Sequence, residues 1–155
     1  MGLDMYLKAE RFLSKYIEPV EDSKSKIEKI NDLFGITNGD DDFRAETVIF
    51  NIAYWRKANA IHAWFVRNVQ DGKDECQKSY VTRDQLKELL TTCKLVLEDH
   101  KKSKDVLPTQ SGFFFGSTDY DEGYFDDLQS TVTQLERILN HPALETMDFY
   151  YQSSW

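Results

Sequence analysis

Both ends of the chain have the residue pattern of β-strands, while the stretches between them are mostly helical. Leu3, Met5 and Leu7 alternate with less apolar residues, which is typical of a strand with one buried face. The aromatic tail over 147–153 and the β-branched run over 46–54 are also typical of strands. Strands this far apart in sequence can pair only across the intervening helices. We therefore expect an α+β fold with a small antiparallel sheet of about three strands.

Amphipathic periodicity predicts about four helices, packed on one face of that sheet. Thr82 and Gln85 have the spacing of a capping box and mark the start of the third helix. Its last turn is basic, at His100 to Lys102. The predicted helices cover residues 24–34, 56–69, 82–102 and about 120–140, the last capped by Thr118 or Asp119. The residues expected in the core are Phe65, Leu89, Cys93, Leu128 and Leu135.

Length and charge narrow the classes of protein further. A chain of 155 residues has the length of one domain, so we expect a single domain over 1–155. The 19 Lys and Arg residues against 27 Asp and Glu residues give a net charge of −8, which disfavours nonspecific binding to nucleic acid. No apolar run approaches the roughly 20 residues of a membrane span, and charged residues near the N-terminus exclude a signal peptide. We expect a cytoplasmic protein with no membrane attachment.

The sequence predicts no metal, no cofactor and no disulfide framework. Cys76 and Cys93 are too few for such a framework and have no histidine at zinc spacing. The acidic residues over 119–127 follow no metal-ligand spacing and are better explained as the start of a helix. No arrangement of Ser, His and Asp can be argued from three histidines, so no catalytic residue is predicted.

The loop over 108–118 is the first candidate binding segment. Two glycines flank three consecutive phenylalanines, and glycine allows a backbone to turn tightly and approach a ligand closely. The flanking hydroxyls and amides can donate and accept hydrogen bonds. The candidate ligand-binding residues here are Thr109, Gln110, Ser111, Gly112, Gly116, Ser117 and Thr118. The alternative is an ordinary loop whose phenylalanines fill the core beneath it.

The segment over 54–64 is the second candidate. It has two consecutive cations and no acid in an acidic chain, and helical spacing places Trp64 away from the expected core face. The alternative is a solvated basic face with Trp64 covered by another element and His62 as a hydrogen-bonded, semi-buried residue. The candidate ligand-binding residues are Tyr54, Trp55, Arg56, Lys57, Asn59 and His62, joined by Tyr151 from the aromatic tail.

Long motifs along the whole chain resemble a family of small uncharacterised proteins of tailed phages and prophages. These motifs are MGLDMYL at 1–7, YWRKANAIH at 54–62, PTQSGFFFGST at 108–118 and FYYQSSW at 149–155. The resemblance implies a viral origin and action in the host bacterial cytoplasm. It also implies an accessory or counter-defence role, because such phage proteins bind host proteins or sequester nucleotide immune signals. It carries over no catalytic residue.

Together these observations favour a non-enzymatic protein that sequesters a small anionic, nucleotide-like immune signal. Bases would stack on Tyr54, Trp55 or Tyr151, and phosphates would meet Arg56, Lys57 and the loop backbone. One alternative is an interaction module that inhibits a host factor through its acidic surface and Trp64. The third is a small enzyme acting on a nucleotide-like substrate, with His62 and a neighbouring Tyr or Asp as acid and base. The sequence leaves a homo-oligomer open.

Overall fold

The chain is divided into two compact units in the computed structural model, which describes residues 2–14, 16, 20–36 and 43–155. Unit 1 comprises Met1–Ala9 and Asn51–Trp155, and unit 2 comprises Glu10–Phe50. Strands β1 (Asp4–Phe12) and β2 (Thr47–Arg56) contribute residues to both units. A single domain over 1–155 stays a prediction.

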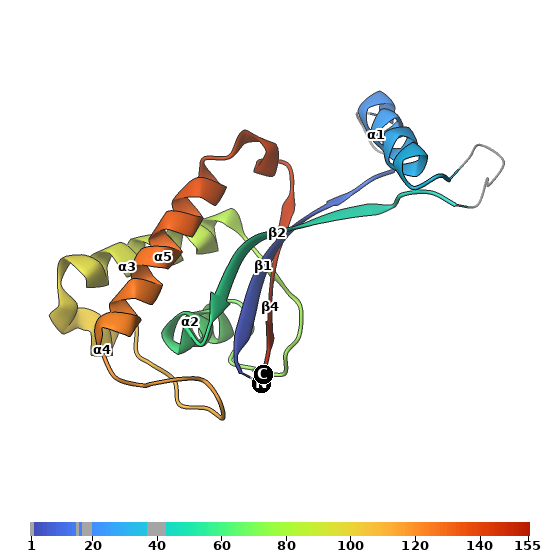
Figure 1. The fold of residues 1–155 in the computed structure, drawn as a ribbon. Helices are drawn as coiled ribbons and strands as arrows, with labels where there is room; N and C mark the ends of the chain where they lie inside the picture. The colour runs from blue at the N-terminus through green and yellow to red at the C-terminus, as the bar shows by residue number, and fades with distance from the viewer. Residues whose placement is uncertain (1, 15, 17–19, 37–42) are drawn as a thin grey trace. The chain divides into compact units, whose positions relative to one another are not determined.

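The sheet has four antiparallel strands in the order β2-β1-β4-β3, of which β2, β1 and β4 are labelled in Figure 1. Strand β3 covers Ser79–Val81 and strand β4 covers Asp148–Ser154, with Tyr80 opposite Tyr150. The predicted α+β class with a small antiparallel sheet is confirmed. The strand-like segments at the two ends of the sequence are neighbours in the sheet, as β1 and β4. The short strand β3 lies in a stretch that the sequence did not identify as a strand.

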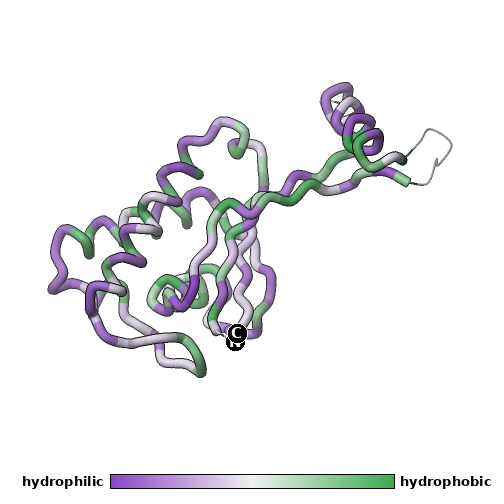
Figure 2. Tube along the Cα trace, in the orientation of Figure 1, coloured by the Kyte–Doolittle hydropathy of each residue, from purple (hydrophilic) through white to green (hydrophobic). Residues whose placement is uncertain are grey.

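Helices α2 (Asn59–Asn68), α3 (Arg83–Glu98) and α5 (Glu122–Leu139) pack on one face of the sheet in unit 1. Their sequences alternate hydrophobic and hydrophilic residues (Figure 2), which leaves one apolar side for the core. The shorter elements are α4 (Ser103–Val106), the 3₁₀ turns η1 (His100–Lys102) and η2 (Pro142–Leu144), and α1 (Val20–Leu33) of unit 2. No helix within the described ranges has both the length and the apolarity to cross a bilayer.

Helix ends follow the side chains that cap them. The predicted capping box is present, with Thr82 accepting from the Gln85 amide and the Gln85 side chain accepting from Thr82. Helix α3 ends at Glu98, because Asp99 caps the separate turn η1; the basic residues over 100–102 therefore do not form its last turn. Helix α5 is capped by Asp121, so the predicted caps at Thr118 and Asp119 are wrong by two to three positions.

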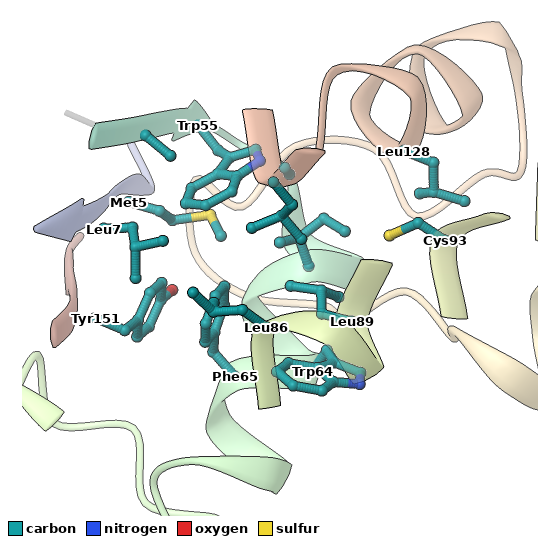
Figure 3. Packing of buried hydrophobic residues seen from close by; sticks show 14 of the residues in the cluster. Met5, Leu7, Trp55, Trp64, Phe65, Leu86, Leu89, Cys93, Leu128 and Tyr151 are labelled. Carbon is teal, nitrogen blue, oxygen red and sulfur yellow. The ribbon is translucent and has the colours of Figure 1, made fainter. Parts of the chain in front are cut away.

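The core of unit 1 contains the apolar faces of the three helices and the inner face of the sheet (Figure 3). All five predicted core residues, Phe65, Leu89, Cys93, Leu128 and Leu135, are fully buried. Phe65 stacks on Tyr151 of the sheet, with ring centroids 4.0 Å apart. Trp64 is also buried, which corrects the prediction that it lies away from the core.

Unit 2 contains α1 and the distal parts of β1 and β2. The amide of Leu13 donates to the carbonyl of Glu46 at 2.7 Å, and the side chain of Asn31 accepts from the Ala45 amide. Asp22 pairs with Arg11 and Lys26, and these cations lower the pKa of its carboxyl. Gly35, at φ 72°, follows the helix as the sequence predicts.

Candidate functional site

A tight turn at Lys57 separates strand β2 from helix α2. Lys57 has a φ of 60°, a left-handed conformation that costs a non-glycine residue about 1–2 kcal/mol. The surrounding bonds hold it there, because its amide donates to the Leu3 carbonyl and its own carbonyl accepts from the Asn59 amide, both at 2.8 Å. Strained backbone of this kind is concentrated at functional sites. The turn also explains why α2 begins at Asn59 instead of at the predicted residue 56.

The side chain of Asn59 joins the two segments that the sequence identified as candidates. Its Nδ2 donates to the carbonyls of Phe115 and Ser117 at 3.1 and 2.7 Å, and its Oδ1 accepts from the Gln110 amide at 3.1 Å. Asn59 is buried, so these bonds form away from competing water. They hold the loop over 109–118 against the start of α2.

The three phenylalanines of this loop divide between core and surface. Phe115 is buried, and a Cβ on Gly112 would lie 2.4 Å from its ring, so only glycine fits there. Phe113 and Phe114 are 81% and 45% exposed, with ring centroids 4.1 Å apart. The alternative that the phenylalanines fill the core therefore holds for one of the three.

A pocket of about 260 Å³ lies between the start of α2, the loop and the start of α5. Gly116 permits the close approach, because a Cβ there would lie 3.2 Å from Cβ of Lys57. The pocket is lined by Arg56, Lys57, Ala58, Asn59, Ala60, Ile61, Thr109, Gly116, Ser117, Asp119, Asp121, Gly123, Tyr124, Asp127 and Leu128.

One wall of the pocket is cationic. The side chains of Arg56 and Lys57 are exposed, and neither forms an ion pair with any residue that the structure describes. The amides of Ala60 and Ile61 belong to the first turn of α2, where backbone N–H groups have no intrahelical acceptor. This wall can therefore accept an anionic group.

The pocket also has an acidic wall, contributed by the start of α5 and the residues before it. Asp119, Asp121 and Asp127 line it. Partial burial, and then repulsion from Asp126 and Asp121, raises the pKa of Asp127 to about 6. Its carboxyl group can therefore hold a proton near neutral pH, and all three carboxyls can accept hydrogen bonds from a ligand. In the described part of the chain, no group of three or more His, Cys, Asp or Glu residues is arranged to hold a metal ion.

Several predicted site residues lie outside this pocket. Trp55, His62 and Tyr151 are buried, because they face the helices and the inner side of the sheet. The two aromatic faces are covered, so Trp55 and Tyr151 cannot serve as the stacking surfaces that the sequence suggested. Tyr54 lies on the outer face of β2, where its hydroxyl donates to Asp4. Gln110, Ser111, Gly112 and Thr118 belong to the loop but do not line the pocket.

His62 does have the neighbours required by the enzyme alternative. Its Nδ1 lies 2.7 Å from the Tyr151 hydroxyl and its Nε2 lies 2.9 Å from Asp74. The indole of Trp155 also donates to Asp74, at 3.1 Å. However, His62 and Tyr151 are fully buried, and burial raises the pKa of the tyrosine well above its usual value. A substrate cannot reach either side chain in this structure, so the chain of bonds stabilises the fold.

Sequence reasoning missed the acidic wall. Asp127 directly precedes Leu128 and lies three residues after Tyr124, both of which are buried on α5. A carboxyl at the margin of a buried helix face is a signal of partial burial. The spacing therefore indicates partial burial of Asp127, but not that it lies beside Asp119 and Asp121 in a pocket.

Comparisons with protein-family models, with curated proteins and with solved structures find no match to this chain. The function is therefore inferred from the pocket itself. Its position, its two oppositely charged walls and its size are the properties that a ligand must fit.

Proposed function

We propose that this protein is a non-enzymatic binding protein that captures a small, nucleotide-like anion in the pocket between α2 and α5. The observation that carries the proposal is the cationic wall, where Arg56, Lys57 and the first residues of α2 line one pocket. A phosphate group would accept charge-assisted hydrogen bonds from both side chains and from the helix amides.

The acidic wall narrows the ligand class. A bare polyphosphate would also face Asp119, Asp121 and Asp127 in the pocket and would be repelled by them. A nucleotide has hydrogen-bond donors on its base and ribose in addition to its phosphate, and these can meet the carboxyls while the phosphate meets the cations. The two walls therefore favour a ligand with an anionic end and a donor-rich end.

The size of the pocket favours a small ligand. Pockets for drug-sized molecules have volumes of roughly 300–1,000 Å³, and this one has about 260 Å³. We therefore favour one nucleoside phosphate over a dinucleotide. Trp55 and Tyr151 are buried and cannot stack on a base, and the exposed Phe113 and Phe114 belong to the loop but do not line the pocket. The carbonyl of Phe114 accepts from the Leu3 amide, next to the turn at Lys57.

The biological role follows from the resemblance to phage proteins. A phage protein that binds a nucleotide signal without converting it would lower the free concentration of that signal in the infected cell. We propose such sequestration as counter-defence. The competing role is inhibition of a host protein, with Trp64 as a contact residue. Trp64 is buried, so it cannot form that contact in this structure.

Isothermal titration calorimetry with linear and cyclic nucleotides tests the proposal. We expect Arg56→Ala to weaken binding about ten- to hundredfold, the loss of one charged hydrogen bond. Lys57→Gly should also weaken binding while keeping the fold, because glycine accepts the positive φ without strain. Arg67→Ala is the matched control, since it removes an exposed cation at the other end of α2. The proposal is wrong if no nucleotide binds, or if Arg56→Ala and Arg67→Ala bind equally well.

A further inference from the structure

Unit 2 has almost no core of its own. Among its described residues, only Leu13 and Ser23 are buried. The part of β1 and β2 in this unit is a ribbon of two strands, and two strands alone are marginally stable in water. Ordering such a segment costs conformational entropy that its internal contacts do not offset.

Large apolar side chains of unit 2 are exposed instead. Ile49 and Phe50 are adjacent on β2 and therefore point to opposite faces of the ribbon, yet they are 53% and 48% exposed. Other exposed apolar side chains lie at the end of α1 and beside it. The exposed side chains are Phe12, Leu33, Phe34, Phe43, Ile49 and Phe50. These side chains lie on both faces of the ribbon and on α1, so no single face presents all of their apolar surface.

The outer edge of β2 is covered by another element along only part of its length. In unit 1, α5 covers this edge: Gln134 accepts from the Tyr54 amide at 3.0 Å, and Arg137 donates to the Ile52 carbonyl at 3.3 Å. Over Thr47–Phe50, no described strand lies on the outer side of β2. This stretch reads Thr-Val-Ile-Phe and is hydrophobic (Figure 2), without the lysine or proline that usually protects an edge strand.

We propose that two copies of this chain associate by antiparallel pairing of their β2 edges over Thr47–Phe50. The pairing would convert two ribbons of two strands into one sheet of four, the size at which a sheet becomes stable. Each copy has a net charge of −8, but residues 47–50 are uncharged. The pairing therefore places no like charges directly opposite each other. The exposed side chains of Ile49 and Phe50 would then lie beside those of the second copy across a two-fold axis, one on each face of the joined sheet.

Analytical ultracentrifugation of the full chain tests the proposal. We expect a dimer that Ile49→Lys converts to a monomer, because lysine on an edge strand opposes pairing. Tyr80→Lys is the matched control, since Tyr80 is similarly exposed, at 54%, but lies on β3 of unit 1. A monomeric wild-type chain at high micromolar concentration would overturn the proposal and leave this surface to a different protein. Dimers that survive Ile49→Lys would also overturn it.

Cysteine cross-linking provides a second test that does not depend on disrupting the strand. Single cysteines at Val48, Ile49 and Phe50, in a Cys76→Ser background, lie next to the proposed two-fold axis. Directly opposed residues of an antiparallel pair have Cα atoms about 4.5–5.5 Å apart, within the range of a disulfide. We expect a covalent dimer from at least one position and none from the control Tyr80→Cys. Equal cross-linking at all four positions, or at none, would overturn the proposal.

Discussion

Unit 1 encloses its apolar side chains, whereas unit 2 leaves most of its own exposed. Strand β2 passes through both and makes the contrast direct. Ala53 and Trp55 are 5% and 4% exposed, while Ile49 and Phe50 on the same strand are about half exposed. The difference comes from the helices, which cover the sheet in unit 1. Apolar residues in a strand therefore indicate a surface to be buried, but they do not say whether the same chain buries it.

The largest effect is expected from removing strand β4, which tests whether the core of unit 1 depends on this strand. Ending the chain before residue 147 removes Phe149 and Tyr151, both fully buried in the core of unit 1, from an internal strand of the sheet. We expect cooperative unfolding to be lost in chemical denaturation. Trp155→Ala, which removes the bond to Asp74 and an edge contact with the Phe115 ring but leaves β4 in the sheet, should retain it. A truncated chain that unfolds like the full one would show that unit 1 does not depend on β4.

Matched leucine substitutions measure the two environments directly. Leu135 of α5 is fully buried, whereas Leu33 of α1 is 80% exposed. We expect Leu135→Ala to lower the free energy of unfolding by about 2–5 kcal/mol and Leu33→Ala to change it by less than about 0.5 kcal/mol. Denaturation monitored by circular dichroism checks both. Similar losses from the two variants would mean that unit 2 is packed more tightly than described.

Two Tyr→Phe substitutions, one buried and one exposed, test the buried hydrogen bonds of unit 1. Tyr151→Phe leaves the stacked ring in place but removes the hydroxyl that bonds Nδ1 of His62. A buried nitrogen without its partner costs about 1–3 kcal/mol, so we expect a loss in that range. Tyr80→Phe on the exposed strand β3 is the control and should be neutral. Equal stabilities would show that His62 finds another partner.

Two carboxyls should give pH dependences of opposite sign. The pKa of Asp127 is raised to about 6, so its ionisation disfavours the folded state as the pH rises from about 4 through 6. Asp127→Asn should therefore stabilise unit 1 at pH 7, by about 1 kcal/mol after allowing for solvent screening. This difference from wild type should vanish below pH 4.

Asp22 of unit 2 is the counterpart. Its cationic partners lower its pKa, so it stabilises the fold above its ordinary pKa, and this contribution is lost as the pH falls through the lowered value. Asp22→Asn should lower stability at pH 7 and match wild type in strong acid. Unfolding curves collected from strong acid to pH 8 compare both variants. Shifts of the same sign would contradict the assigned environments.

Periodicity predicted the parts of the fold that depend on local sequence. The capping box at Thr82 and the buried faces of α3 and α5 follow from residues a few positions apart. Strand β3 could not be predicted in this way, because its three residues owe their conformation to pairing with β4, a contact about 70 residues away in sequence.

The candidate site was predicted in part, for a related reason. Arg56, Lys57 and Asn59 were identified from composition, and the structure brings them against the loop over 109–118. Helical phase placed Trp64 outside the core on the assumption of one solvent-facing side, but α2 is buried on all sides from Asn59 to Val66. The acidic wall arises only when α5 packs beside α2, which no local pattern encodes.

The bonds of Asn59 have a consequence for how this molecule can change over evolution. Its amide presents two donor bonds to carbonyls and one acceptor to an N–H group. Aspartate would set a negative oxygen against two carbonyl oxygens, and glutamine would be too long by one methylene. The loop and the start of α2 are therefore expected to diversify around a fixed asparagine, so that variation in ligand preference accumulates in the neighbouring pocket residues while position 59 stays unchanged.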